Sequence, residues 1–270
     1  MNLVQRREAA DLIDLERYPV GVPGSPEFWG FVDKCRKRLA KDGVILMPGF
    51  TTGDATRVLR DEAVALLPGA YYCDIRHNCY LQPSDPSFPP DHPRNRTHRN
   101  NKGGIANDLI PGSALLRRIY DWKPLRDFLA AVLGLDALYP LADPLSSLNI
   151  NVHRTGQIQG WHFDGARFAV TLMLQAAEAG GRFEYVLNLR SDEDPNYAGV
   201  ARVLDGDRAH VRSIDIDDGM LIVFRGHHSL HQVTAPEGGR LRINAIFSYA
   251  AQPGVILHEH TRRLFYGRVF

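Results

Sequence analysis

SLNINVHRTGQIQGWHFD, residues 147–164, is the stretch of sequence that decides the fold. Its first part alternates between apolar and polar side chains, as a strand does when its two faces meet different surroundings. The polar positions are Asn149, Asn151 and His153. In the closing WHFD, side chains two positions apart point the same way, so the imidazole of His162 and the carboxylate of Asp164 converge. The stretch predicts a strand-rich fold with two metal ligands on one face.

Five segments downstream also read as short strands: FAVTLML, FEYVL, VARVL, MLIVF and RINAIFSY. Clusters of glycine, aspartate, asparagine and proline separate them, with clear turn signals at 179–181 and 217–219. Strands that follow one another without helical patterns between them indicate an antiparallel sandwich or jelly roll and not a parallel α/β sheet. We therefore expect a β-sandwich core over about 141–270.

The first 140 residues read mainly as helices that support this sandwich. Ser25-Pro26 and Gly43 have the residue types that begin and end a helix, and 43–50 reads as a short buried strand. Further helices are expected at 55–67, 113–122 and 124–133. Asp54 is the expected cap of the first of these. Because no internal repeat or low-complexity tail interrupts the sequence, we expect one domain over 1–270, mainly β with flanking helices.

A long stretch between these helices, residues 81–104, does not read as packed structure. It holds five prolines, several asparagines and a basic cluster. The cluster comprises Arg94, Arg96, His98 and Arg99. Long irregular segments in compact domains are often lids or binding loops. Both a lid that meets an anionic group and a solvated loop are compatible with this pattern.

Composition excludes several classes of partner. The 32 Lys+Arg against 31 Asp+Glu leave a net charge of +1, whereas nucleic-acid-binding proteins show a basic excess. No stretch approaches the roughly 20 apolar residues of a membrane helix, and the charged N-terminus lacks a signal-peptide core. The three cysteines form no even disulfide framework. We expect a cytoplasmic protein with reduced thiols and with neither nucleic acid nor membrane as a partner.

The third metal ligand is expected from FRGHHSLHQVT, which offers His227, His228 and His231. Two imidazoles and one carboxylate on one face leave coordination positions open for a chelating co-substrate and O₂, as in non-haem iron(II) oxygenases. The far carboxylate of a co-substrate such as 2-oxoglutarate needs a fixed cation, and the planar guanidinium of arginine suits that pairing. Arg242 is the expected cation. Arg240 is the competing choice, although its place at a glycine turn favours exposure to solvent.

Taken together, these motifs resemble the Fe(II)/2-oxoglutarate-dependent dioxygenase superfamily, whose fold is a double-stranded β-helix (jelly-roll, cupin-like). More closely, the segments WHFD, AVTLMLQAAEAGGRFEYV, HSLHQVTAPEGG and RINAIFSY resemble the amino-acid radical halogenases, lysine-halogenase-like enzymes, and their hydroxylase relatives. The resemblance implies that Fe(II) is held by His162, Asp164 and His231, and that 2-oxoglutarate is held by Arg242.

Three further residues are candidate contacts to 2-oxoglutarate, one from the resemblance and two from their positions in the sequence. Asn151 is similar to a strand asparagine that contacts this co-substrate in several members. Asn244 shares a strand face with Arg242, and Thr171 lies on the strand after the His-x-Asp pair.

The family's halogenases have a small residue where the carboxylate ligand would be, so that chloride occupies the iron site. Because Asp164 fills that position here, the resemblance implies a hydroxylase. Such an enzyme consumes O₂ and 2-oxoglutarate, releases succinate and hydroxylates an unactivated C–H bond. Desaturation or ring closure uses the same cofactors and stays open as an alternative.

A free amino acid or a similar small polar molecule is the expected substrate. Its carboxylate needs a cation, for which Arg96 and Arg99 are candidates, and its ammonium needs an acid or amide, for which Asp143 is a candidate. Gln159, three residues before His162, stands where the similar lysine halogenases would have an imidazole. This difference argues against lysine itself as the substrate.

Two other classes of protein share part of this pattern. One is a cupin-like, non-enzymatic protein whose histidine cluster holds an idle metal ion, and the other is an oxygenase of a carrier-bound or peptide substrate. An idle metal site has no need of an inward guanidinium, so Arg242 favours the enzyme. The sequence has no sizeable basic or apolar run that would dock a carrier.

Overall fold

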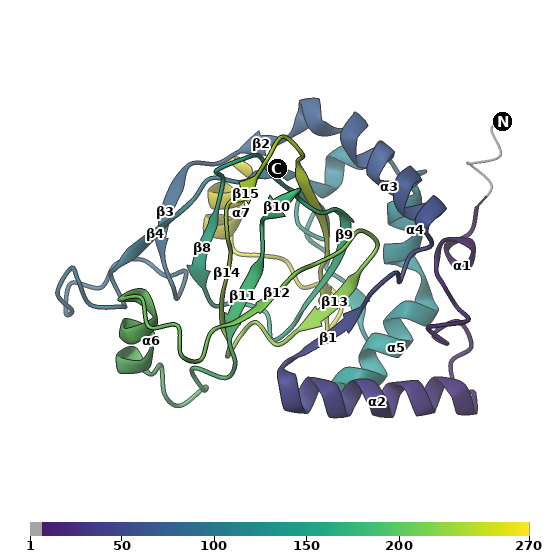
Figure 1. The fold of residues 1–270 in the computed structure, drawn as a ribbon, viewed down its shortest axis with the longest axis horizontal. Helices are drawn as coiled ribbons and strands as arrows, with labels where there is room; N and C mark the ends of the chain where they lie inside the picture. The colour runs from purple at the N-terminus through teal and green to yellow at the C-terminus, as the bar shows by residue number, and fades with distance from the viewer. Residues whose placement is uncertain (1–6, 270) are drawn as a thin grey trace.

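The computed structural model describes residues 7–269, and two facing antiparallel sheets form its centre (Figure 1). The strand order of the larger sheet is β1 (Val44–Met47), β13 (Leu221–Phe224), β9 (Ala169–Gln175), β16 (Arg242–Phe247), β7 (Leu148–His153), β5 (Gly103–Ile105) and β2 (Tyr71–Tyr72). The strand order of the smaller sheet is β12 (Arg212–Ile214), β11 (Phe183–Val186), β14 (Leu230–Val233), β8 (Gln159–His162), β4 (Thr97–Asn100) and β3 (Ile75–Asn78).

Two further sheets consist of two short strands each. They are β10 (Ala179–Gly180) with β15 (Pro236–Glu237), and β17 (Tyr249–Ala250) with β6 (Tyr139–Pro140). Along the chain, β7, β9, β13 and β16 of the larger sheet alternate with β8, β11 and β14 of the smaller one. Alternation of this kind is the arrangement of a jelly roll. The predicted fold class, mainly β with flanking helices, is confirmed.

The helices of the described residues are α1 (Ala9–Leu12), α2 (Pro26–Asp42), α3 (Gly53–Ala65), α4 (Leu115–Asp121), α5 (Lys123–Leu133), α6 (Tyr197–Leu204) and α7 (Glu259–Tyr266), with short 3-10 turns η2 (Leu67–Gly69) and η3 (Asn107–Leu109). Figure 1 shows α2, α3, α4 and α5 together on one side of the larger sheet. They share one buried apolar cluster with that sheet, in which Leu59 of α3 and Phe128 of α5 lie with Leu172 of β9. The opposite face of the larger sheet therefore points inward, toward the smaller sheet.

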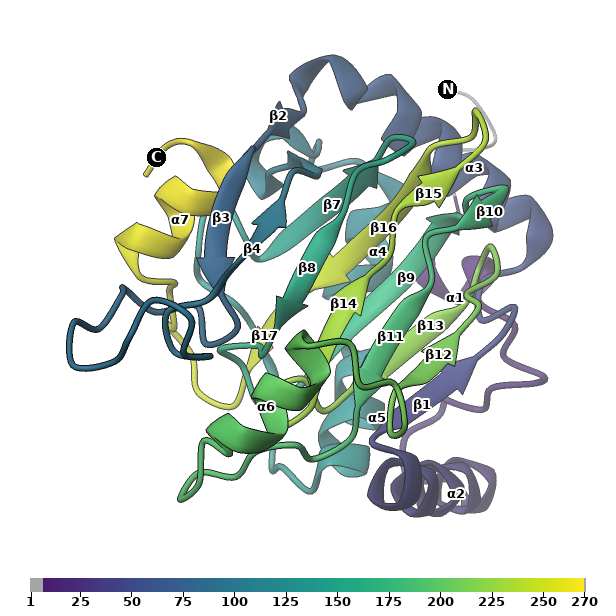
Figure 2. The ribbon, with the colours of Figure 1, turned by 60° about the vertical axis from the view of Figure 1, so that its left-hand side comes forward.

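The smaller sheet has its own apolar cover on its outer side. Val200 and Val203 of α6 belong to a buried cluster with Trp161 of β8 and Leu230 of β14, and Figure 2 shows α6 across the ends of these strands. Between the two sheets, the ring of Phe224 on β13 lies 5.0 Å from that of His231 on β14. The space between the sheets is thus lined by alternate residues of both.

Most of the predicted N-terminal elements are confirmed, and one cap is corrected. The hydroxyl of Ser25 accepts the amide of Phe28 at 3.1 Å, and Gly43 ends α2 with a φ of 71°, as the sequence indicated. At α3 the prediction of Asp54 as the cap was wrong. Thr52 caps this helix, because its hydroxyl accepts the amide of Ala55.

Two other expectations were also wrong. VARVL was expected as a strand, but it lies in α6, because its valines pack on the smaller sheet at helical spacing. The irregular stretch 81–104 is shorter than expected, because Thr97–Asn100 forms β4 and Gly103 begins β5. Strands this short give little period-2 signal, although they place the residues described next.

Candidate active site

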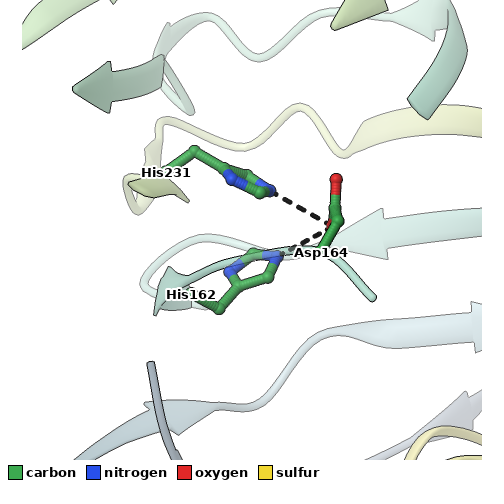
Figure 3. Close-up of side chains that lie close together, drawn as sticks. All are labelled: His162, Asp164 and His231. Atoms are coloured by element: carbon green, nitrogen blue, oxygen red, sulfur yellow. Dashed lines mark ion pairs between the residues drawn. The ribbon is translucent and has the colours of Figure 1, made fainter. Parts of the chain in front are cut away.

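His162, Asp164 and His231 lie together at the end of β8 and on the neighbouring β14 (Figure 3). His162 and His231 are direct cross-strand partners, and their ring centroids are 4.1 Å apart. The Oδ1 atom of Asp164 is 3.7 Å from Nε2 of His162 and 3.4 Å from Nε2 of His231. One potential ligand atom from each residue lies within 4.8 Å of the others, so the cluster has the size of a metal site.

Backbone contacts orient both imidazoles. Nδ1 of His162 lies 2.8 Å from the carbonyl oxygen of Gly160, and Nδ1 of His231 lies 2.9 Å from that of Ser229. Because a carbonyl can only accept, Nδ1 carries the proton in each ring and Nε2 carries the lone pair. This is the arrangement that a metal-ligating histidine needs.

The segment after β13 positions the carboxylate of Asp164. The amide of Asp164 donates to the carbonyl of Gly226 at 3.0 Å, and a Cβ on Gly226 would lie only 1.8 Å from Oδ2 of Asp164. Among residues 7–269, Oδ2 is buried without a hydrogen-bond partner. A carboxylate oxygen in that position fits a bound cation, since an unpaired buried acceptor is otherwise unfavourable.

The protonation of the cluster also suits metal binding. Burial and, to a lesser extent, the nearby His231 lower the pKa of His162 to about 3 against the opposing effect of Asp164. Burial alone would raise the pKa of Asp164, but His231 and His162 together hold it below the usual value. At neutral pH the site therefore presents a neutral His162 and an ionised Asp164.

A second group of polar residues lies on the inward face of the larger sheet. Arg242 of β16 is paired in register with His153 of β7, and Asn244 with Asn151. The Nε of Arg242 donates to the carbonyl of Gly181 at 3.0 Å. Thr171 of β9 is opposite Ile246 of β16, so it shares this face with Arg242 and Asn244.

Lys102, directly before β5, adds another cation to this group. Its Nζ donates to Oδ1 of Asn151 and lies 5.6 Å from the ring centroid of Phe265. Burial lowers the pKa of Lys102 to about 8 and that of Arg242 to about 10. Neither cation has an acidic partner within the part of the chain that the structure describes.

Between the two cations lies a histidine without partners. Both ring nitrogens of His153 are buried and make no hydrogen bond to the described residues. Burial, followed by the charges of Arg242 and Lys102, holds its pKa well below the usual value. Oδ1 of Asn244 is likewise unpaired. This end of the inter-sheet space thus has an excess of positive charge and free polar atoms, which suits an anion.

The four residues assigned to substrate have different positions. Arg96 pairs with Asp205, and Arg99 pairs with Asp74 at 2.8 Å on the surface. The carboxylate of Asp143 is buried and accepts three backbone amides. The structure therefore does not bring these three side chains to the metal cluster. They hold other parts of the chain together.

Gln159 is the exception, because its amide nitrogen lies 3.1 Å from Nε2 of His162. The register between β8 and β14 shifts, so that the four residues Gln159–His162 of β8 lie opposite the three residues 231–233 of β14. This bulge turns Gln159 to the same side as His162. A regular strand would have placed them on opposite faces.

Two further histidines lie beside the cluster. His77 of β3 and His98 of β4 are paired in register, and the ring of His77 is 6.0 Å from that of His162. Their Nε2 atoms are buried and unpaired within residues 7–269, and burial lowers the pKa of both. In the sequence His98 stands out only as part of the basic cluster, and His77 and Lys102 do not stand out, because the short strands here give no clear periodicity.

The alternatives for ligand and cation lie outside this space. His227 and His228 are grouped with Asp192 and not with the cluster, and Arg240 pairs with Asp218 on the surface.

In residues 7–269, no helix combines the length and the apolar character that crossing a membrane requires.

Comparisons with known proteins agree with the geometry. Residues 29–265 match the model of a family described as HalD, Halogenase D. Similar solved structures include AviO1 from Streptomyces viridochromogenes Tue57 (16% identity, TM-score 0.56, covering 83% of this chain and 96% of that one). Another is the non-haem α-ketoglutarate-dependent epimerase SnoN from nogalamycin biosynthesis (12% identity, TM-score 0.56, covering 82% of this chain and 83% of that one).

A third similar structure is an oxidoreductase of the 2OG-Fe(II) oxygenase family from Burkholderia pseudomallei (15% identity, TM-score 0.52, covering 83% of this chain and 92% of that one). At these identities the similarity establishes the fold. No curated protein matches the sequence.

Proposed function

The chain belongs to the Halogenase D family, and on this premise we propose that it is an Fe(II)/2-oxoglutarate-dependent hydroxylase. In this proposal it hydroxylates an unactivated C–H bond of a free amino acid or a similar small polar molecule and converts 2-oxoglutarate to succinate. The observation that carries the proposal is the combination, in one inter-sheet space, of a three-donor cluster and two buried cations without acidic partners in residues 7–269.

Iron would be held by Nε2 of His162, Nε2 of His231 and the carboxylate of Asp164. This donor set fits iron(II), because two imidazoles and one carboxylate bind it while leaving positions open. When bound, the iron supplies the activation of O₂ and the oxidising power that breaks a C–H bond. The protein holds the two rings by their Nδ1 protons and holds Asp164 against Gly226, so that the ligands are fixed before the metal arrives.

2-Oxoglutarate would have its far carboxylate between Arg242 and Lys102, with Asn151, Asn244 and Thr171 on the same face. Two cations that are buried without a counterion are unfavourable, and a dianionic co-substrate relieves that cost. The free nitrogens of His153 and the free Oδ1 of Asn244 give such a ligand hydrogen-bond partners.

Hydroxylation is favoured over halogenation because Asp164 occupies the ligand position that is small in the family's halogenases.

For the substrate, Gln159 is the best-supported contact, since it lies beside His162. Arg96, Arg99 and Asp143 have other partners, so we propose that the neutral imidazoles of His77 and His98 take part in substrate binding with Gln159. We also propose a reducing, cytoplasmic location, which the buried free thiols of the cysteines support.

An anaerobic titration tests the cofactor chemistry. Fe(II) and 2-oxoglutarate together should give a weak visible metal-to-ligand band in the wild-type protein, and His162→Ala should abolish it. A wild-type protein without the band would have an idle metal site of the cupin-like kind.

Substrate is tested separately. The aerobic enzyme is incubated with Fe(II), 2-oxoglutarate and each of the twenty amino acids, and succinate and +16 products are followed by mass spectrometry. A +16 product supports hydroxylation and a −2 product supports desaturation or ring closure. If no amino acid stimulates succinate formation, the free-amino-acid proposal fails while the cofactor assignment stands.

A further inference from the structure

Asp192, His227 and His228 form a second cluster of metal-binding side chains, outside the cluster of His162, Asp164 and His231. Oδ1 of Asp192 lies 2.9 Å from Nε2 of His228 and 3.5 Å from Nε2 of His227, and the three ligand atoms all lie within 4.8 Å of one another. We propose that these residues form a peripheral site for a divalent transition metal ion of the Zn²⁺ class.

The spacing of the three atoms suits a tetrahedral ion. Zinc–ligand bonds of about 2.0–2.1 Å place two ligands of a tetrahedron roughly 3.3 Å apart. This value lies between the two distances from Oδ1 of Asp192 to the imidazoles, 2.9 and 3.5 Å. Two imidazoles and a carboxylate are ligands that zinc accepts, and a water molecule can complete the set. A surface cavity of about 470 Å³, lined in part by His228, Asp194 and Arg225, gives the ion access from solvent.

The surroundings define the ligand atoms. Nε2 of His228 donates to Oδ1 of Asp192 at 2.9 Å, and a metal ion would take the place of that proton. Nδ1 of His227 lies 3.0 Å from the carbonyl oxygen of Asp164, so Nδ1 carries the proton and Nε2 is the available ligand atom. The guanidinium of Arg167 lies 3.6 Å from Oδ2 of Asp192, which leaves Oδ1 to face the two imidazoles. His227 and His228 are both partly buried, whereas Asp192 is exposed.

The peripheral site is joined to the active-site cluster by a short stretch of backbone. The carbonyl of Gly226 accepts the amide of Asp164, and His227 donates to the carbonyl of Asp164. A metal ion on His227 and His228 fixes the segment that positions the Asp164 carboxylate. Binding at the two sites is therefore coupled, and the coupling acts equally in both directions.

Calorimetric titration of the metal-free chain, residues 1–270, with Zn²⁺ tests the site. The wild-type protein should bind two equivalents of Zn²⁺. His228→Ala should bind one, at the active-site cluster, and His162→Ala should bind one, at the peripheral site. His210→Ala, which removes an exposed histidine outside both clusters, is the control and should keep two. Asp192→Asn is a second variant in case His228→Ala does not fold, and circular dichroism verifies the fold of each.

Each outcome decides between the sites. Two equivalents in both His228→Ala and Asp192→Asn, or a single wild-type equivalent that His162→Ala removes, would overturn the peripheral site. The wild-type protein could instead bind one equivalent of Zn²⁺ that is lost in His228→Ala and retained in His162→Ala. Zinc would then bind only at the peripheral site, which would contradict the proposed function. If the sites are coupled, the affinity of the active-site cluster for Zn²⁺ should be at least about fivefold lower in His228→Ala than in the wild-type protein. Equal affinities would refute the coupling.

Discussion

At the scale of single residues, the absence of a side chain at Gly226 makes room for Asp164 in the cluster with His162 and His231. Asp164 can approach the backbone of residue 226 only because no Cβ stands in its way. The φ of Gly226 is not positive, so alanine is compatible with the backbone at this position. The close approach therefore explains the glycine in FRGHH better than backbone conformation does.

Gly226→Ala should therefore weaken metal binding without removing a ligand. We expect the affinity of the cluster for Zn²⁺ or Fe(II) to fall roughly 10- to 100-fold, as for other changes that disturb the support of metal ligands. Calorimetry measures this affinity. Gly165→Ala is the matched control, because a Cβ there meets no atom within 4 Å. Equal affinities in the two variants would show that Gly226 does not position Asp164.

Two ligands, one with and one without the far carboxylate, distinguish an ion pair made by Lys102 from a general effect of Lys102 on protein stability. Lys102→Met should weaken binding of 2-oxoglutarate by about 1.5–3 kcal/mol, the range for hydrogen bonds to charged groups. It should leave 2-oxovalerate, which lacks the far carboxylate, unaffected. Binding is measured anaerobically with Zn²⁺ in place of iron, and Lys37→Met, on the exposed face of α2, is the control. An equal loss for both ligands would contradict an ion pair with the far carboxylate.

The lowered pKa of Lys102 also predicts how 2-oxoglutarate binding depends on pH. Only the ammonium form pairs with a carboxylate, and in the ligand-free protein this form is lost as the pH rises through about 8. Affinity for 2-oxoglutarate should fall above pH 8, by up to tenfold per unit, while Arg242 stays charged until about pH 10. Lys102→Arg should remove the dependence between pH 8 and 10. A wild-type affinity that is constant over this range would show that Lys102 does not contribute its charge.

At the scale of secondary-structure elements, small irregularities place two of the candidate functional side chains. The bulge in β8 turns Gln159 toward His162, and the short strand β5 brings Lys102 next to β7. Side-chain caps begin α2 and α3, two of the helices that support the larger sheet. At α3 the cap is Thr52, one position before the helix begins.

Thr52→Ala should therefore destabilise the protein by about 1 kcal/mol, the usual cost of losing a helix N-cap. Asp54→Ala should cost less, since Asp54 lies in the first turn and pairs with arginines that are themselves partly exposed. Urea unfolding of both variants compares them directly. If Asp54→Ala were the more damaging change, the assignment of Thr52 as the cap would be wrong.

At the scale of the whole molecule, one apolar cluster joins the N-terminal helices to the larger sheet. Phe128 of α5 is fully buried in it and stacks on Phe31 of α2 at 5.2 Å, and the same cluster includes Leu172 and Phe247 of the sheet. We propose that the helical part and the sandwich fold as a single domain, because neither can bury its apolar face alone.

Phe128→Ala should cost about 3–5 kcal/mol and shift one cooperative transition. Far-ultraviolet circular dichroism reports on the helices, and the fluorescence of Trp161 in the smaller sheet reports on the sandwich, with the other two tryptophans changed to phenylalanine. The two signals should have the same urea midpoint in the wild-type protein and in the variant. Separate midpoints would indicate two domains.

The sequence by itself determined what depends on neighbouring residues. The alternation in β7, the helix signals at Ser25 and Gly43 and the jelly-roll pattern of short strands all follow from side-chain periods and caps. The family resemblance was likewise present in the sequence motifs. Tertiary structure decided what depends on distant segments meeting. It grouped His231 with Asp164 and His228 with Asp192, buried Lys102 beside Arg242, and gave Arg96 and Arg99 partners of their own. Long-range pairing and burial set these outcomes, and neither is encoded in local periodicity.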